Sequence, residues 1–482
     1  MLPPLLDHAL APERFRALGH ELVNLLADHL SDMHGRKGPV LPVRSPEDEA
    51  ADWPVPARDA RVDLRALVAR VIASSNHLHH PRYVGHQVSA PLPVAALAEL
   101  ASAVLNNGMA VFEMGPAATA MERACVQWMA GKLGLPEGAG GVLTSGGSAG
   151  NLTALLAARQ SRAGFDAWTD GTHAGPPLAI LVGGDAHYSI ARAAQIMGLG
   201  AGGVVPVALD ARHRLDPAAL PLSLERARRT GRRPIAVVAS ACSTATGAFD
   251  PLPPIADFCA GHDLWLHVDA AHGGAAALSA RHRGLLEGAD RADSLVWDAH
   301  KLLAQPALVT AVLFRDGRRS FDTFAQRASY LFGEANEWDL GQRTLECTKR
   351  MMSLELYATL ACDGERVLSA HVERTFDLAT RFAARIAAAS DFELALPPDC
   401  NIVCFRYTPP DVSATELDAL QSRARADILR SGAFYLVETT LSGRRYLRTT
   451  IMNPLTTDED LDALLEAVRS ARQIAKPGSP SR

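Results

Sequence analysis

From about residue 178 onward, short apolar runs alternate with segments whose apolar residues have helical spacing. The apolar runs include LAILVG (178–183), PIAVVAS (234–240), LWLHVD (264–269) and SLVW (294–297). Helical segments such as SIARAAQIMG (189–198) and PIADFCAG (254–261) lie between them. This alternation predicts a mainly parallel sheet with helices on both faces.

The flanking regions have different patterns. Residues 10–34 have helical spacing, and a proline-rich stretch at 39–57 predicts a connecting arm. Beyond about residue 365, strand-like runs such as NIVCFRY (401–407) mix with an amphipathic helix near 414–431 and a last helix capped near Thr456 or Thr457. The sequence therefore predicts an N-terminal helical arm and dimerisation segment (1–90), a large domain (91–365) and a small α+β C-terminal domain (366–482).

Composition narrows the class of protein. The 482 residues are 48% hydrophobic and carry a net charge of -5, so no global basic field attracts nucleic acid or an anionic membrane. The seven cysteines form no CxxC pair, which favours reduced thiols in a cytoplasmic protein. No window offers about 18 uncharged apolar residues, and the N-terminus lacks the pattern of a signal peptide. HLHH (77–80) has no accompanying carboxylate or cysteine cluster, so no metal site is expected.

Three ionisable residues follow predicted core strands. Asp269 ends LWLHVD, His187 follows LAILVGGDA, and Lys301 follows SLVWDAH. A lone aspartate there is usually a turn former and a lone histidine is usually structural. In open α/β sheets, however, ligands bind at the carboxyl ends of the strands. The three together predict a ligand site at that edge.

A glycine- and serine-rich turn lies upstream in VLTSGGSAGNLTALLAAR (142–159), between a predicted strand and a helix. Backbone N–H groups of Gly146 and Gly147 at the helix start, with the Ser148 hydroxyl, suit a phosphate. No GK[ST] follows, and GxGxxG is absent, so neither a Walker loop nor a nicotinamide site is indicated.

These features match the needs of pyridoxal 5'-phosphate. Its aldehyde requires an amine, its ring nitrogen an anion, its face a flat partner and its phosphate an anion site. Lys301, Asp269, His187 and the turn at 146–148 offer one group for each role.

The chain resembles the group II pyridoxal-phosphate-dependent amino-acid decarboxylases, which include aromatic L-amino-acid and 2,4-diaminobutyrate decarboxylases. The resemblance covers most of the chain, through HPRYVGHQ (80–87), TSGGSAGNL (144–152), DAHYSIARAA (185–194), TATGAFDPL (244–252), LHVDAAHGG (266–274), DAHK (298–301) and LRTTIMNPLTT (447–457). It implies a fold-type I, aspartate-aminotransferase-like α/β enzyme that acts as a cytoplasmic homodimer on an L-amino acid.

The resemblance also implies roles for single residues. Lys301 would bind the cofactor aldehyde, Asp269 would pair with the ring nitrogen and His187 would stack on the ring. The phosphate site would comprise Gly146, Gly147 and Ser148, with Asp298, His300 and Thr244 nearby. His300 would also help in proton transfer. Ser89 would contact the substrate carboxylate and His86 would line the pocket. His272 stands where relatives often carry an aromatic residue.

One stretch departs from the family. Many members carry a tyrosine that delivers the final proton on a mobile loop, whereas residues 330–352 are shorter and have no tyrosine after Tyr330. Two other reactions of the same cofactor therefore stay open, which are oxygen-dependent aldehyde synthesis and carbon–carbon cleavage. A non-catalytic binding protein is a further alternative, and the substrate side chain is not indicated.

Overall fold

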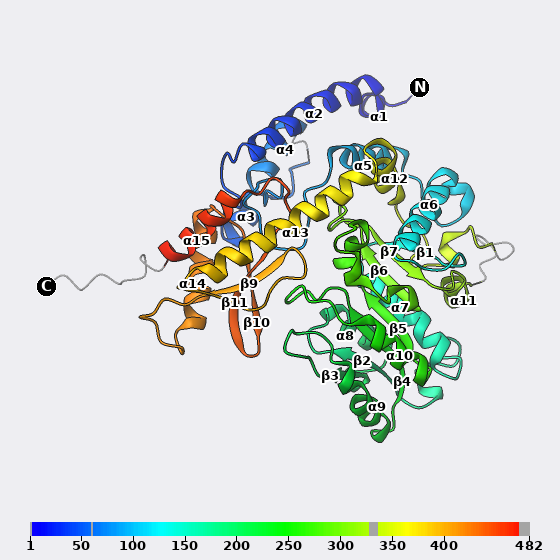
Figure 1. Ribbon diagram of the computed structural model, residues 1–482. Helices are drawn as coiled ribbons and strands as arrows, with labels where there is room; N and C mark the ends of the chain where they lie inside the picture. Colours follow the sequence, from blue (N-terminus) through cyan, green and yellow to red (C-terminus); the bar gives the residue numbers. More distant parts are fainter. Residues whose placement is uncertain (1, 59–60, 327–335, 472–482) are drawn as a thin grey trace. The chain divides into compact units, whose positions relative to one another are not determined.

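The computed structural model describes residues 2–58, 61–326 and 336–471, which divide between two compact units (Figure 1). The larger unit comprises Gln87–Thr380 and Leu396–Val403, and the smaller comprises Met1–His86, Arg381–Ala395 and Cys404–Arg482. One border falls inside the helix α13 (Glu365–Ala388). The domain boundaries expected after residues 90 and 365 stay predictions.

A mixed sheet forms the centre of the larger unit. Within the described ranges it has seven strands in the order β1, β7, β6, β5, β4, β2, β3. The bounds are β1 (Gly140–Thr144), β2 (Leu178–Gly183), β3 (Val204–Val207), β4 (Arg233–Ser240), β5 (Trp265–Asp269), β6 (Ser294–Asp298) and β7 (Thr310–Phe314). Strands β3, β2, β4, β5 and β6 pair in parallel, while β7 is antiparallel to both β6 and β1. The predicted mainly parallel α/β fold is thus confirmed.

Helices cover this sheet. Every residue of β5, β6 and β7 is buried, as expected for strands with both faces covered. Helix α7 (Gly147–Arg162) packs on β4 to β7, and α10 (Leu252–His262) packs on β4 and β5. The other helices of this unit are α5 (Pro93–Leu105), α6 (Pro116–Lys132), α8 (Tyr188–Ile196), α9 (Leu220–Arg229), α11 (Arg319–Phe324) and α12 (Ser353–Cys362).

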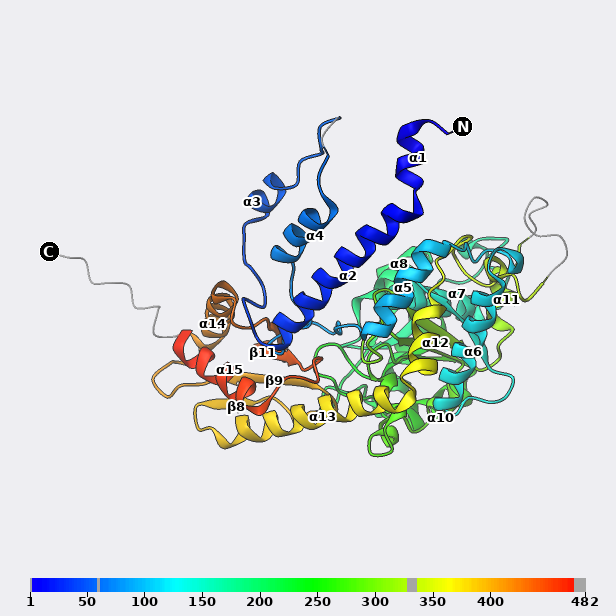
Figure 2. The same cartoon turned by 90° about the horizontal axis from the view of Figure 1, so that it is seen from above.

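The smaller unit has its own sheet, in the order β10, β11, β9, β8 within the described residues. These strands are β8 (Phe392–Leu394), β9 (Ile402–Tyr407), β10 (Val437–Leu441) and β11 (Arg444–Thr450). Its helices are α1 (Pro4–Leu10), α2 (Pro12–His34), α3 (Pro46–Ala51), α4 (Leu64–Ala73), α14 (Leu417–Ser431) and α15 (Asp458–Ala471). Helices α2 and α4 lie side by side (Figure 2). No helix among the described residues is both long and apolar enough to cross a membrane.

The proline-rich stretch expected to be a connecting arm contains the short helix α3. Pro46 occupies the first turn, and the Ser45 side chain accepts a hydrogen bond from the Asp48 amide. Both features favour a helix start. The predicted cap at Thr457 is confirmed, since its hydroxyl accepts from the Asp460 amide at 3.3 Å.

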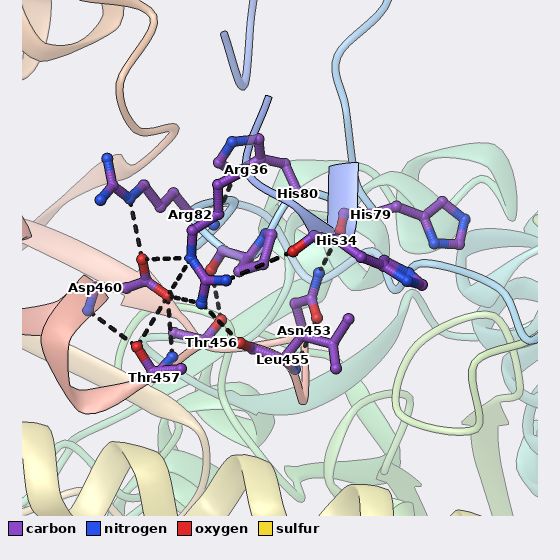
Figure 3. Close-up of polar contacts among 11 residues, drawn as sticks. His34, Arg36, His79, His80, Arg82, Asn453, Leu455, Thr456, Thr457 and Asp460 are labelled. Carbon is purple, nitrogen blue, oxygen red and sulfur yellow. Dashed lines mark hydrogen bonds and ion pairs between the residues drawn. The ribbon is translucent and has the colours of Figure 1, made fainter. Parts of the chain in front are cut away.

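The side chain of Asp460 joins distant parts of the smaller unit (Figure 3). Arg36 donates to both of its carboxylate oxygens, and Arg82 Nε donates to Oδ1 at 3.0 Å. The carboxylate is 3% exposed. One buried anion therefore binds the end of α2, the HPRY segment and the start of α15.

Candidate active site

A cavity of about 320 Å³ lies within the larger unit, at the carboxyl ends of β4, β5 and β6. These parallel strands end at Ser240, Asp269 and Asp298, so their last side chains meet at one edge of the sheet. The cavity is lined by Ser145, Gly146, Gly147, Ser148, Asn151, His187, Ser240, Cys242, Ser243, Thr244, Asp269, Ala271, His272, Asp298, His300, Lys301 and Leu308. The structure thus brings together every residue proposed from the sequence for cofactor binding.

The loop between β1 and α7 forms one wall of this cavity. Gly146 has φ of +107°, which side chains rarely adopt. A Cβ atom on Gly147 would lie 3.2 Å from each carboxylate oxygen of Asp298, so glycine lets this carboxylate approach the loop. Helix α7 begins at Gly147, and Ser148 lines the cavity in its first turn; the anion site expected here stays a prediction.

Lys301 is held by the carboxylate that ends β6. Its Nζ lies 2.9 Å from Asp298 Oδ2, and Thr310 Oγ1 donates to Asp298 Oδ1 at 2.5 Å. Burial lowers the pKa of Lys301, but Asp298 and Asp269 outweigh burial, so the pKa is raised. Burial raises the pKa of Asp298, but Lys301 and His300 outweigh it, so this pKa is lowered. The two groups form an ammonium–carboxylate pair.

His300 lies beside this pair. Its Nδ1 is 2.9 Å from the carbonyl oxygen of Val309, and its Nε2 is 3.7 Å from Asp298 Oδ2. The Val309 amide also donates to Nδ1 at 3.2 Å, so the Val309 backbone engages this nitrogen in either tautomer and leaves Nε2 facing Asp298.

Asp269 and His187 are fixed by hydrogen bonds. Asp269 accepts from Asn151 Nδ2 at 3.0 Å and from the Ala271 amide at 3.2 Å. His187 caps α8, and its Nδ1 accepts from the Ser189 amide at 3.3 Å. Burial lowers the pKa of His187, with a smaller opposing effect of Asp269. The ring is therefore a neutral, planar group, as a stacking partner should be.

The two residues expected to contact the substrate, Ser89 and His86, are not among those that line this cavity. The Ser89 hydroxyl donates to the backbone oxygen of Lys301 at 2.5 Å. His86 is the last residue of the first segment of the smaller unit, where its ring lies 5.7 Å from that of Tyr435. Tyr330 is outside the described residues. Contacts of Ser89 and His86 with a substrate stay predictions.

Sequence reasoning missed several lining residues. Ser240 ends β4 and Ser243 follows it, so the strand-end rule that found Asp269 would have found both. Asn151 stands one helical turn after Gly147 and Ser148 and shares their face of α7. Leu308 could not have been found, since its place depends on the irregular loop between β6 and β7.

The set of groups fits pyridoxal phosphate. One cavity holds a lysine amine, a carboxylate that accepts two hydrogen bonds, a neutral imidazole and a helix start that a Cβ atom would obstruct. These are the amine, the anion, the flat partner and the phosphate cradle that the cofactor requires.

Comparisons with known proteins agree with this chemistry. The family model of the pyridoxal-dependent decarboxylase conserved domain matches residues 44–408. The chain is 35% identical over 411 residues to the L-2,4-diaminobutyrate decarboxylase of Rhizobium meliloti (strain 1021), covering 82% of this chain and 80% of that protein. It is 28% identical over 473 residues to the aromatic-L-amino-acid decarboxylase of Bacillus atrophaeus, covering 96% of each. The crystal structure of mouse CSAD in apo form superposes with a TM-score of 0.88 at 28% identity, covering 95% of this chain and 99% of that one.

Proposed function

The chain belongs to the pyridoxal-dependent decarboxylase family and catalyses the pyridoxal-phosphate-dependent decarboxylation of an L-amino acid, and we propose that the cavity around Lys301 is where it does so. One observation supports this proposal above all. A single cavity at the sheet edge is lined by Lys301, Asp269, His187 and the loop at 146–148. When bound, the cofactor supplies an electron sink for the pair released as the bond to the carboxylate breaks.

The protein groups have separate tasks. Lys301 binds the cofactor aldehyde, and Asp298 holds its ammonium beforehand. Asp269 pairs with the ring nitrogen and His187 covers the ring. Gly146, Gly147 and Ser148 bind the phosphate, with Thr244 at the same wall of the cavity.

His300 and Ser89 act on the substrate side of the reaction. His300 Nε2 moves the proton that replaces CO2 at Cα, since Nδ1 is engaged with the backbone carbonyl and amide of Val309. Ser89 contacts the substrate carboxylate, and the contact expected for His86 stays a prediction. The Ser89 hydroxyl donates its one proton to the backbone oxygen of Lys301, so it must turn away from that oxygen to donate to a carboxylate.

The enzyme acts as a cytoplasmic homodimer. Apolar side chains are exposed along the first helices, including Leu10 at 64% and Phe15 at 57%, and a second copy would cover them. All seven cysteines fall within the described residues and none is in a disulfide, as expected in a reducing compartment.

The reaction is tested by CO2 release from pooled L-amino acids, with Lys301→Ala alongside. The pools separate diamino, aromatic and acidic amino acids, and oxygen uptake is followed in parallel. Release that disappears in the variant supports the site, and the active pool identifies the substrate class. Undiminished release from Lys301→Ala would refute the assignment of Lys301, and stoichiometric oxygen uptake with an aldehyde product would favour aldehyde synthesis.

Sedimentation tests the dimer. We expect twice the chain mass of 51.4 kDa, and a shift to the monomer in Leu10→Asp with Phe15→Asp. Leu222→Asp changes a residue that is 66% exposed on α9 and should leave the dimer intact. A wild-type monomer would refute the proposal.

A further inference from the structure

A chain of buried side-chain hydrogen bonds leads from the interior of the larger unit to Asp269 and His187. It runs through Trp265, Ser294, His267, Asn151 and Ser189. The successive distances are 2.8 Å (Trp265 Nε1 to Ser294 Oγ), 2.9 Å (Ser294 Oγ to His267 Nδ1), 2.9 Å (His267 Nε2 to Asn151 Oδ1), 2.9 Å (Asn151 Nδ2 to Ser189 Oγ) and 2.7 Å (Ser189 Oγ to His187 Nδ1). Asn151 Nδ2 also donates to Asp269 Oδ2.

The Asn151 oxygen sets the direction at the inner end. An amide oxygen only accepts, so His267 carries its hydrogen on Nε2 and donates to Asn151 Oδ1. In a neutral ring Nδ1 then accepts from the Ser294 hydroxyl, whose oxygen accepts from the indole N–H of Trp265. Burial lowers the pKa of His267 to about 4, consistent with a neutral ring that has one N–H.

The outer end requires the same direction independently. The backbone N–H of Ser189 donates to His187 Nδ1, so this nitrogen is an acceptor and the Ser189 hydroxyl must also donate to it. Ser189 Oγ is then free to accept from the Asn151 amide nitrogen. With its oxygen fixed toward His267, the two amide hydrogens of Asn151 serve Ser189 and Asp269.

We propose that Asn151 is a positioning residue for the reaction, whose amide, oriented by His267, fixes the Asp269 carboxylate in rotation. The inference rests on the proposed function, since it takes Asp269 as the partner of the ring nitrogen. Asn151 donates to Oδ2 and the Ala271 amide donates to Oδ1, so the plane of this carboxylate is fixed by a donor on each oxygen. A carboxylate held in this way is oriented to accept a hydrogen bond from a ring N–H.

Only a side chain with both an N–H donor and an oxygen acceptor can serve Asp269 and His267 from position 151, and asparagine has both. An aspartate at 151 would place a second acceptor 3.0 Å from Asp269 Oδ2, and two carboxylates so close share a proton at neutral pH. An apolar residue would remove the donor to Asp269 and the acceptor of His267. The aspartate weakens the negative charge that the ring nitrogen meets, and the apolar residue releases the Asp269 carboxylate from its fixed orientation.

The test compares two ligands for the protein freed of cofactor: pyridoxal phosphate, and its deaza analogue, in which a C–H group replaces the ring nitrogen. Binding is followed by absorbance for the wild type, Asn151→Asp and Asp269→Asn. We expect Asn151→Asp to weaken binding of pyridoxal phosphate by about 10- to 100-fold. Binding of the deaza analogue should change by less than about threefold, well below the effect of one lost charged hydrogen bond.

Other results distinguish the role of Asn151 from the assignment of Asp269 as the partner of the ring nitrogen. Equal weakening of both ligands by Asn151→Asp, or no weakening of either, would overturn the role of Asn151 while leaving Asp269 as the nitrogen partner. A wild type that binds both ligands equally, and is unchanged by Asp269→Asn, would overturn the assignment of Asp269 and the inference with it.

A second pair of variants avoids dependence on how well Asn151→Asp folds. His267→Gln keeps an N–H donor for Asn151 Oδ1, whereas His267→Leu removes it. We expect a selective loss of pyridoxal phosphate binding in His267→Leu and its rescue in His267→Gln. His371→Leu, which changes a buried histidine outside this network, should show no selectivity, and the same selectivity there would overturn the proposal.

Discussion

The pairing of Lys301 with Asp298 has a measurable consequence for the charge of the lysine. Lys301 must lose its proton before its amine can attack the cofactor aldehyde. The pKa of Lys301 is raised because Asp298 and Asp269 outweigh burial. In Asp298→Asn one of these carboxylates is removed, so the pKa of Lys301 falls and more neutral amine is present at a given pH.

We therefore expect the pH midpoint for cofactor incorporation into the apo protein to fall by about 1 unit or more in Asp298→Asn, as for the loss of a nearby opposite charge. The measurement is the rate of cofactor incorporation as a function of pH. The midpoint of this curve reports the pKa of Lys301, and its plateau reports how well the cofactor phosphate is bound. Thr310→Val removes a hydrogen bond to Asp298 but no charge and should shift the midpoint much less. An unchanged midpoint in Asp298→Asn would contradict the paired ammonium.

For single residues, the sequence predicted the functional side chains that follow strands, but it did not predict the side chains that orient these functional groups. Lys301 and Asp269 could be found because strand ends in a parallel sheet meet at one edge. The contact between His267 and Ser294 arises because these residues pair across β5 and β6. Strand register is a tertiary property that neither segment contains alone. The orienting role of Asn151 was therefore hidden, although its motif was recognised.

Among the elements, a buried ion pair fixes β1, the strand that leads into the phosphate loop. Lys349 Nζ donates to Glu122 Oε1 of α6 at 2.5 Å and to the Leu143 carbonyl at 2.7 Å, and the Leu143 amide donates to the same Glu122 oxygen at 2.9 Å. Both charged side chains are at most 2% exposed. Removing one partner of such a pair leaves an uncompensated charge in the interior.

We expect Lys349→Met to lower the free energy of unfolding by about 3–5 kcal/mol, and the double variant Lys349→Met with Glu122→Gln to lose less than the two single changes added together. Urea unfolding of the three variants measures this. The matched control is Lys132→Met, which breaks a pair whose side chains are 32% and 39% exposed and should cost about 1 kcal/mol or less. Additive losses in the double variant would contradict direct coupling.

The elements themselves were predictable to different degrees. The apolar runs identified β2, β4, β5 and β6, because buried parallel strands are almost continuously hydrophobic. Strand β3 was missed, since it is a short edge strand with an exposed proline at 206. The antiparallel direction of β7 also followed only from its pairing, because an apolar run has no direction.

For the whole molecule, the sequence predicted the family and the α/β fold but not how the segments group. The helices α1 to α4 of the N-terminal segment bury one hydrophobic side chain, Met33, and the segment belongs to the same unit as the C-terminal segment. What joins them includes the ion pairs of Asp460 with Arg36 and Arg82 (Figure 3). Partners separated by more than 370 positions leave no local signal in the sequence.

The same cluster makes the smaller unit sensitive to acid. Burial raises the pKa of Asp460, but the hydrogen bonds from Arg36 and Arg82 outweigh it and lower the pKa to about 2. Because the folded pKa lies below the unfolded value of about 3.9, this stabilisation is complete above pH 4 and is lost as the pH falls through about 2. A shift of this size corresponds to about 2 kcal/mol.

Asp460→Asn should therefore lower the stability of the smaller unit by about 2 kcal/mol at pH 7 and flatten its pH dependence between about 4 and 2. Hydrogen exchange of amides in α15 and residues 78–84, measured across this range, reports on the unit itself. Asp462→Asn is the control on the same helix, since Asp462 is 53% exposed in its pair with Arg385 and contributes little. If both variants exchange alike at every pH, the Asp460 cluster does not hold the start of α15 to the segments that carry Arg36 and Arg82.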